Sequence, residues 1–339
     1  MLRRELDEQF LPDGGQFELS PMYHALGFED LLDLLNLVQH FPGLLPAGMV
    51  ARLCHHAGAA RRWLGLLSHP DGQIAFFNDA AFGIAPGNAD LDRYAGRLGI
   101  PAPPPPGAVE HLAASGYLRL AAGPAVLLAD LARIGPDYLP GHAHADTLSF
   151  ELSVFGQRVF VNSGTGEYGT GPERQRQRGT AAHNTVVLAG QDSSEVWGGF
   201  RVGRRAWLRD IAIETAADGT MTATATHDGY AHLPGRPLHR RNFAMTATGL
   251  RISDRILAAA GPGLAEARFH LHPAVRLREQ DGQPVLQLPA GRILHLVLRG
   301  GRWRAELASW HPEFGLTQAS TCLVLPLAAG EATFELCWG

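Results

Sequence analysis

The first hundred residues carry hydrophobic positions at helical spacing. Leu2, Leu6 and Phe10 follow this spacing, and the Pro-Asp-Gly-Gly segment at 12–15 then breaks it. The same spacing predicts further helices at residues 28–38, 49–67 and 91–98, with a loop at 69–83 that packs apolar side chains beneath it. We therefore expect residues 1–100 to form a helical unit.

A proline run marks the end of that unit. The stretch IPAPPPPG at 100–107 is stiff and extended, because proline fixes its backbone and donates no hydrogen bond. A chain of 339 residues exceeds one typical domain. We place a linker at 101–107 and a second domain at 108–339.

After the linker the hydrophobic period changes to two, which predicts strands. Gly, Pro, Asp and Asn separate the apolar stretches, as in a large antiparallel β-sandwich. The predicted strands are residues 116–120, 125–130, 148–154, 158–161, 185–188, 206–214, 221–227, 240–246, 250–256, 268–272, 293–298, 322–327 and 333–337. The predicted fold class is α+β with two domains.

Composition narrows the possible partners. The formal net charge is −4 and every basic residue is arginine, so an anionic ligand would have to meet a local arginine cluster. Three widely spaced cysteines with no CxxC motif argue against a cysteine zinc site. No apolar run has membrane-spanning length, and the charged N-terminus shows no signal peptide.

Three histidines gather between Gly141 and Thr185. His142 and His144 are two apart, and Asp146 continues the alternation. Because residues two apart on a strand point to the same face, we expect these three side chains on one strand face. His183 would join them from another strand.

These residues belong to motifs that, as a set, resemble the heparinase II/III-like polysaccharide lyases. The motifs are HAH at 142–144, VNSGT at 161–165, HNT at 183–185 and LPDGGQFELSPMYH at 11–24. The resemblance implies a partial α/α toroid followed by an antiparallel β-sandwich. It also implies a lyase that cleaves a uronate-containing anionic polysaccharide by β-elimination.

The resemblance assigns catalysis to Tyr23, with His142 as its partner. A phenol has a reference pKa near about 10, so it acts as acid or base only when its site adapts it. A neutral imidazole can take a proton or help to neutralise a carboxylate. The alternatives are a half-buried aromatic at a helix start for Tyr23 and a histidine bonded to neighbouring backbone for His142.

His144, Asn162 and His183 match positions that hold a structural zinc ion in several of these lyases. The family usually has Asp where this chain has Asn162, and an amide ligates without charge. Asp146 would be the compensating ligand. The alternative is a polar network in which Asn162 bonds both histidines without metal.

Three further residues are predicted to contact substrate: Arg178, His24 and Trp197. Arg178 lies nearest His183 in an alternating run of three arginines. The other two, Arg174 and Arg176, are expected to lie in a solvated loop. His24 follows Tyr23 and has loop shaping as its alternative role. Trp197 would stack on a sugar ring, with a core position as the alternative.

The family carries an Asn-His pair upstream of its catalytic tyrosine, and no such pair precedes Tyr23 here. We therefore expect this chain to be part of a longer protein or to lack activity. A non-catalytic carbohydrate-binding protein in polysaccharide assembly or export is the second hypothesis. A cupin-like iron oxygenase is the third, but Glu151 lies too far after His144 for that motif. The family resemblance implies the periplasm or cell envelope.

Overall fold

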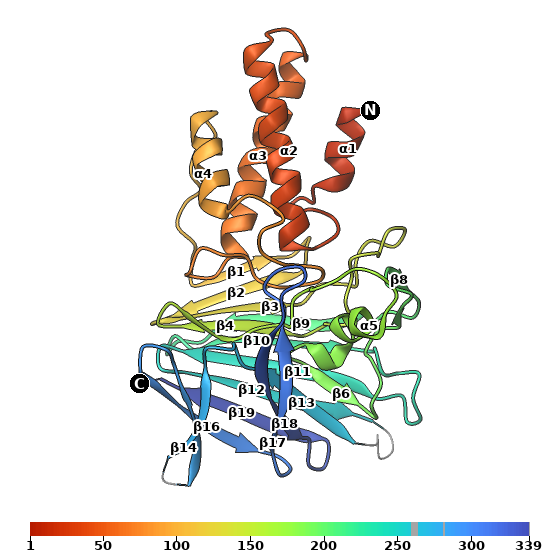
Figure 1. The fold of residues 1–339 in the computed structure, drawn as a ribbon, viewed down its shortest axis with the longest axis vertical. Coiled ribbons are helices and arrows are strands. Elements are labelled where there is room, and N and C mark those ends of the chain that lie inside the picture. The colour runs from red at the N-terminus through yellow and green to blue at the C-terminus, as the bar shows by residue number, and fades with distance from the viewer. Residues whose placement is uncertain (259–263, 281, 339) are drawn as a thin grey trace.

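Four helices stand on a stack of antiparallel sheets (Figure 1). The computed structural model describes residues 1–258, 264–280 and 282–338. The N-terminal helices are α1 (Leu2–Gln9), α2 (Pro21–His40), α3 (Ala47–Leu66) and α4 (Asn88–Arg97). Within the described residues no helix is long and apolar enough to cross a membrane.

The start of α2 is fixed by a local cap. The Ser20 hydroxyl accepts a hydrogen bond from the Tyr23 amide at 3.2 Å, and Pro21 occupies the first helical turn. Both features favour a helix start. The cap bonds an amide that has no partner within the helix, and proline has no amide hydrogen that would need one. Tyr23 is therefore held in the first turn of α2.

A five-stranded sheet lies directly beneath the helices, in the order β1-β2-β3-β4-β5 (Figure 1). Its strands are β1 (Val109–Leu112), β2 (Tyr117–Ala122), β3 (Ala125–Asp130), β4 (Phe150–Val154) and β5 (Gln157–Phe160). Every residue of β3 and β4 is buried, because helices and loops cover one face and a second sheet covers the other.

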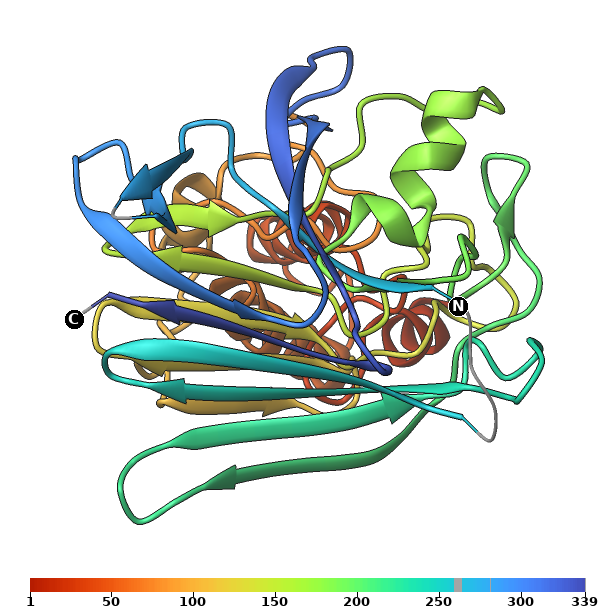
Figure 2. The same ribbon diagram turned by 90° about the horizontal axis from the view of Figure 1, so that it is seen from below.

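The second layer is an eight-stranded antiparallel sheet in the order β14-β15-β16-β19-β12-β11-β10-β9 (Figure 2). Burial alternates residue by residue along β11 and β12, so one face of the sheet packs on the core. Its strands are β9 (Leu208–Thr215), β10 (Met221–His227), β11 (Leu238–Thr246), β12 (Gly249–Leu257), β14 (Arg276–Gln280), β15 (Gln283–Gln287), β16 (Ile293–Arg299) and β19 (Glu331–Cys337).

Two smaller sheets complete the fold. The first has the order β17-β18-β13-β6, and the second is a hairpin of β7 and β8. Their strands are β6 (Val186–Leu188), β7 (Val196–Trp197), β8 (Arg201–Val202), β13 (Ala265–His270), β17 (Arg304–Trp310) and β18 (Gln318–Pro326). Between β5 and β6 lie a short helix α5 (Pro172–Arg178) and one 3₁₀ turn at Thr180–Ala182.

One large apolar core joins the sheets, and a separate core lies among the helices. The sheet core contains residues such as Leu127, Phe150 and Phe334 from different strands. The helix core contains Phe28, Leu53 and their neighbours. This arrangement agrees with the predicted α+β class, whereas the partial α/α toroid and the division at the proline run stay predictions. Residues 101–107 themselves carry no helix or strand.

The predicted helices are found, with α2 starting seven residues earlier than predicted, and each predicted strand segment after the proline run overlaps a strand. The strands β1, β7, β8, β14, β15 and β17 were not predicted. The strand prediction for the histidine motif is wrong, since residues 141–149 form turns and irregular backbone before β4. The amide of His144 bonds the Asn78 side chain at 3.1 Å, and that of Ala145 bonds the Arg178 carbonyl at 2.8 Å. These bonds replace the pairing that a strand would make.

Candidate active site

Asp79 is a buried carboxylate on which several polar side chains converge. One of its oxygens accepts from His142 Nδ1 at 2.9 Å, and the other accepts from His144 Nε2 at 2.8 Å. Arg174 donates to both oxygens. Burial alone would raise the pKa of Asp79, but the bonds from His142 and His144 outweigh it and hold the pKa well below its usual range. Asp79 is therefore an anion that orients two histidines.

The loop that carries Asp79 is fixed on both sides. Its amide donates to the His142 carbonyl at 3.0 Å, and its carbonyl accepts from the Ser20 hydroxyl at 2.5 Å. Next to it, the Asn78 side-chain amide donates to the Leu19 carbonyl at 2.9 Å. The same Ser20 caps α2, so the positions of Asp79 and Tyr23 are coupled.

Tyr23 and His142 lie against each other at the junction of the helices and the sheets. Their ring centroids are 4.0 Å apart, and the Tyr23 hydroxyl is 2.7 Å from the hydroxyl of Tyr168. Burial raises the pKa of Tyr23, so its phenol is protonated at neutral pH. Because His142 Nδ1 bonds Asp79, Nε2 is the ring nitrogen left for another partner, and it lies 3.8 Å from a Glu18 oxygen.

Asp146 does not join this group, contrary to the prediction of a shared strand face. Its carboxylate is buried and accepts from the Asn78 amide at 3.3 Å. Burial raises the pKa of Asp146 to about 7. Among the described residues no three His, Cys, Asp or Glu side chains gather for a metal ion, so Asp146 does not complete a site with His144 and His183.

His144 and His183 pack against each other beneath Asp79, with ring centroids 5.2 Å apart. Both rings are buried, and burial lowers the pKa of each, that of His144 to about 4. Within the described chain, His144 Nδ1 and both ring nitrogens of His183 have no hydrogen-bond partner. Neutral imidazoles with free nitrogens are the form that binds a transition metal.

Asn162 lies beside them, fully buried. Its Oδ1 accepts from the Asn184 amide at 3.3 Å, while its Nδ2 has no partner in the described part of the chain. No three His, Cys, Asp or Glu side chains of the described residues gather as a metal group. The atoms free to hold a metal ion are thus nitrogens of the two imidazoles, and Asn162 adds none of the charge that makes zinc binding tight.

The three arginines lie on helix α5 and not in the predicted loop. Arg174 and Arg178 are fully buried, whereas Arg176 lies on the opposite face and pairs with Glu173 at 2.6 Å. Arg178 donates to the Ala143 carbonyl at 2.9 Å and lies under the β7–β8 hairpin. The solvated-loop prediction is therefore wrong for Arg174, and Arg178 does not reach the surface of the cleft.

His24 and Trp197 take opposite positions. His24 is fully buried, packs on Trp63 at 4.2 Å between ring centroids, and bonds the Gln16 amide and the Ala60 carbonyl. It shapes the segment before α2, which was its alternative role. The Trp197 side chain is 50% exposed on the β7–β8 hairpin, so it is available to a ligand and is not a core residue.

Sequence analysis missed Asp79 and Tyr168. Asp79 follows Asn78 inside the otherwise apolar run IAFFNDAAF, and a polar pair in such a run is the signal that would have found it. Tyr168 lies in the glycine-rich stretch after Thr165, and no local pattern indicates that its hydroxyl meets that of Tyr23.

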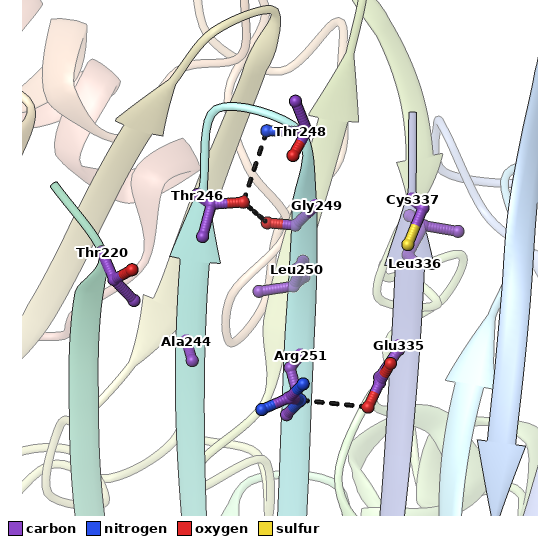
Figure 3. Close-up of a pocket in the computed structure, with 10 residues that line it drawn as sticks. All are labelled: Thr220, Ala244, Thr246, Thr248, Gly249, Leu250, Arg251, Glu335, Leu336 and Cys337. Carbon is purple, nitrogen blue, oxygen red and sulfur yellow. Dashed lines mark hydrogen bonds and ion pairs between the residues drawn. The ribbon is translucent and has the colours of Figure 1, made fainter. Parts of the chain in front are cut away.

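A hollow away from these residues lies on the eight-stranded sheet (Figure 3). It has a volume of about 270 Å³ and is lined by residues of β11, β12 and β19 with Thr220 and Thr248. Its carboxylate, Glu335, is paired with Arg251 at 3.0 Å, and none of its ten lining residues is a histidine. Its ionisable lining groups besides Arg251 are Glu335, which is ion-paired, and the Cys337 thiol, so it has no histidine or tyrosine arrangement like that at Tyr23 and His142.

Comparison with known proteins agrees with these features. A family model described as heparinase II/III-like, C-terminal, matches residues 104–338, and one described as heparinase II/III N-terminus matches residues 1–84. No curated protein matches the chain.

Two solved structures show the same fold. The heparan sulfate lyase HepC from Pedobacter heparinus has a TM-score of 0.75 at 18% identity, covering 99% of this chain and 54% of its own. A heparinase III structure has a TM-score of 0.76 at 17% identity, covering 99% and 55%. The chain thus spans about half the length of the structures that it matches.

Proposed function

Because the chain belongs to the heparinase II/III-like family, we propose that it is a polysaccharide lyase that cleaves a uronate-containing polysaccharide by β-elimination. The observation that carries this proposal is the contact between Tyr23 and His142, with His142 bonded through Nδ1 to Asp79. The arrangement supplies a proton acceptor and a proton donor side by side.

The reaction needs both groups. The acceptor removes the proton on C5, which is α to the uronate carboxylate, and the electron pair forms the C4–C5 double bond. The C4–O4 bond breaks, and the donor gives its proton to the leaving oxygen. No water is consumed, so the two products together have the mass of the substrate.

We assign the acceptor role to His142. Its Nδ1 lies 2.9 Å from the ionised Asp79, which favours the tautomer with hydrogen on Nδ1. Nε2 then carries the free electron pair, and His142 lines the groove beside it. This is the logic by which a carboxylate orients the imidazole in hydrolase triads.

We assign the donor role to Tyr23. A phenol whose pKa is raised by burial keeps its proton at neutral pH and is a poor base. Its hydroxyl lies 2.7 Å from that of Tyr168, whose pKa is raised by burial and by Asp79. Tyr168 holds the Tyr23 hydroxyl in place and supplies a second proton on the same path.

A zinc ion held by His144, Asn162 and His183 would serve as a brace below this centre. Its chemistry there is structural: it would tie the HAH loop to the segments before and after α5. The proposal rests on the three unpartnered imidazole nitrogens named above, and the neutral Asn162 makes the expected binding weak. We also propose the periplasm or cell envelope as the site of action, from family membership alone.

The test is the ultraviolet absorbance of the unsaturated uronate that a lyase releases. The chain is incubated with heparan sulfate, chondroitin sulfate and alginate, alongside Tyr23→Phe and the matched control Tyr94→Phe. Tyr94 is a suitable control because its hydroxyl bonds Asp33 on α2 and has no part in the site.

We expect Tyr23→Phe to lose about 100- to 10,000-fold in rate, the usual contribution of general acid–base catalysis, while Tyr94→Phe keeps wild-type activity. Equal activity of Tyr23→Phe and wild type would refute the assignment of Tyr23. Binding of the polysaccharide with no absorbance change would favour a non-catalytic carbohydrate-binding protein.

A further inference from the structure

A groove of about 780 Å³ opens next to His142. One wall is the loop 137–142, which includes Tyr138, and the other is the β7–β8 hairpin with Trp197 and Phe200. The His142 and Phe200 ring centroids are 6.2 Å apart. The groove is therefore continuous with the position at which proton transfer is proposed.

The groove gathers exposed aromatic side chains. Tyr138 is 64% exposed, Trp197 50% and Phe200 41%. Phe200 also packs edge-on against Tyr168, with centroids 5.2 Å apart, so the aromatic surface runs on towards Tyr23. Neighbouring aromatic rings left open to solvent indicate a binding surface, and their faces suit the apolar side of a sugar ring.

The hairpin side of the groove is positively charged. Arg201 lies over the Trp197 ring at 5.4 Å and takes part in no ion pair within the described residues. Beneath it, Arg178 donates to the carbonyls of Ala143, Trp197 and Arg201, which are neutral. Burial, and then Arg174, lowers the pKa of Arg178 to about 10, so it stays charged at neutral pH.

Other charged groups around the groove do not cancel the positive charge on its hairpin side. Arg205 is paired with Asp137 at 2.9 Å, which cancels one charge of each sign. The nearest acids on the helix side are Glu8, which accepts from the Tyr138 hydroxyl at 2.7 Å, and Glu18 near His142. Glu195, next to β7, bonds the Arg204 amide at 3.2 Å and does not line the groove, whereas Arg201 lines it and is available to a ligand.

The hairpin is held rigidly by helix α5. Arg178 bonds both of its strands, and Arg174 Nε donates to the Gly199 carbonyl at 3.0 Å while its guanidinium binds Asp79. Gly199 has a φ of +79°, and a Cβ there would lie 2.2 Å from the Gly169 carbonyl oxygen. A surface fixed in this way binds a ligand without first having to order itself.

We propose that this groove is a subsite for an anionic sugar unit that neighbours the uronate at His142. Trp197 stacks on the pyranose ring, and Arg201 pairs with the carboxylate or sulfate that the ring carries. This proposal rests on the lyase function above and names part of its substrate: a chain with negative charge on adjacent sugars.

The test measures binding apart from catalysis. Arg201→Gln and Trp197→Ala are each made in the Tyr23→Phe background and titrated calorimetrically with three oligosaccharides of equal length: unsulfated uronate, sulfated uronate and neutral. Arg251→Gln and Trp207→Ala are the matched controls, because both side chains are exposed and lie outside the groove. Thermal unfolding checks that each variant is folded.

We expect Arg201→Gln to weaken binding of the anionic oligosaccharides about 10- to 100-fold, the range for hydrogen bonds to charged groups, and to leave the neutral one unchanged. An equal loss for both anionic ligands identifies a carboxylate, and a loss confined to the sulfated one identifies a sulfate. In the active background the same change raises KM and leaves kcat within about twofold.

Two results would overturn the proposal. Wild-type affinity in both groove variants would show that the groove is not a subsite, even if the lyase reaction is observed. Equal losses of affinity in Arg251→Gln and Arg201→Gln would show that the effect comes from the overall charge of the protein and not from the groove. If no lyase activity is found but Arg201→Gln still loses affinity, the lyase assignment fails and the binding site stands.

Discussion

At the scale of single residues, the site depends on one carboxylate. The Asp79 carboxylate accepts hydrogen bonds from His142, His144 and Arg174. Its backbone also bonds Ser20 and His142. Removing a charge from a buried ion pair leaves the partner uncompensated, which costs about 3–5 kcal/mol. Both the stability of the fold and the proposed catalysis therefore depend on Asp79, and a test has to separate them.

Asp79→Asn should abolish the preference for hydrogen on His142 Nδ1, because an amide NH₂ donates where the carboxylate accepted. We expect kcat to fall at least about 100-fold, by analogy with carboxylate replacement in hydrolase triads. The matched control is Asp254→Asn, since Asp254 is as buried and accepts from Arg241 and His239. Both variants should lose stability, but only Asp79→Asn should lose activity in the folded protein at low temperature. Equal activity of the two folded variants would contradict the positioning role.

Asn162→Asp should convert the histidine pair into a firm zinc site, because it adds the missing charge. We expect the variant to retain about one zinc per chain after dialysis that strips the wild type, and His183→Ala in the same background to lose it. Metal content by mass spectrometry is the measurement. Equal zinc in the wild type and the variant would show that the amide is sufficient.

At the scale of elements, helix α5 shows why sequence analysis placed its arginines wrongly. The run ERQRQR resembles a solvated loop, but in a helix residues four apart share a face. Arg174 and Arg178 are therefore buried together towards the site, and Arg176 faces the other way to Glu173 and His311. The side that a charged helix presents depends on distant carboxylates such as Asp79, which no local pattern reveals.

The histidine motif shows the same limit. Polar and apolar residues alternate from His142 to Asp146, which is the pattern of a strand. Its amides instead bond the Asn78 side chain and the Arg178 carbonyl, groups far away in sequence. By contrast, the alternation along β11 and β12 was sufficient to predict both strands, because they pair with each other across a short turn. Local pairing was predictable, and long-range loop contacts were not.

Replacing the buried Arg174 and the partly exposed Arg176 in turn should distinguish the two faces of α5 by their contributions to stability. Arg174→Gln leaves Asp79 without its buried cation, so the free energy of unfolding should fall by about 3–5 kcal/mol. Arg176→Gln removes a partly exposed pair with Glu173, which is worth at most about 1 kcal/mol. Urea unfolding of both variants is the measurement. Similar losses in the two variants would contradict the burial of Arg174.

At the scale of the whole molecule, the site is assembled where the helices meet the sheets (Figure 1). Tyr23 comes from α2, Asp79 from the loop before α4, His142 from the loop before β4 and Arg174 from α5. The resemblance of the sequence motifs predicted Tyr23 and His142 as partners. Their contact depends on the docking of the helical part onto the five-stranded sheet, which only the folded chain shows.

Buried neutral histidines should make this assembly sensitive to acid. Burial lowers the pKa of seven fully buried histidines, namely His24, His69, His144, His183, His227, His239 and His270. The unfolded chain binds more protons than the folded one below about pH 6.5, so stability is present above that pH and is lost as pH falls towards 4. Asp130 and Asp146, whose pKa values are raised by burial, oppose this trend but are fewer.

We therefore expect Tm to fall between about pH 6.5 and 4, where the buried histidines outnumber the carboxyls that oppose them. Calorimetry across this range is the measurement. The variant His144→Gln should show a shallower fall, because it removes one of the titrating groups. A Tm that rises on acidification would contradict the assignment of neutral buried histidines.

The central claim is that Tyr23 and His142 carry out an elimination and not a hydrolysis. The most direct measurement is mass spectrometry of the products formed from a uronate polysaccharide in water labelled with heavy oxygen. Elimination takes no oxygen from solvent, so we predict unsaturated ends without label, formed by the wild type and lost in Tyr23→Phe. Labelled, saturated products would contradict the account, as would unsaturated ends formed equally by Tyr23→Phe.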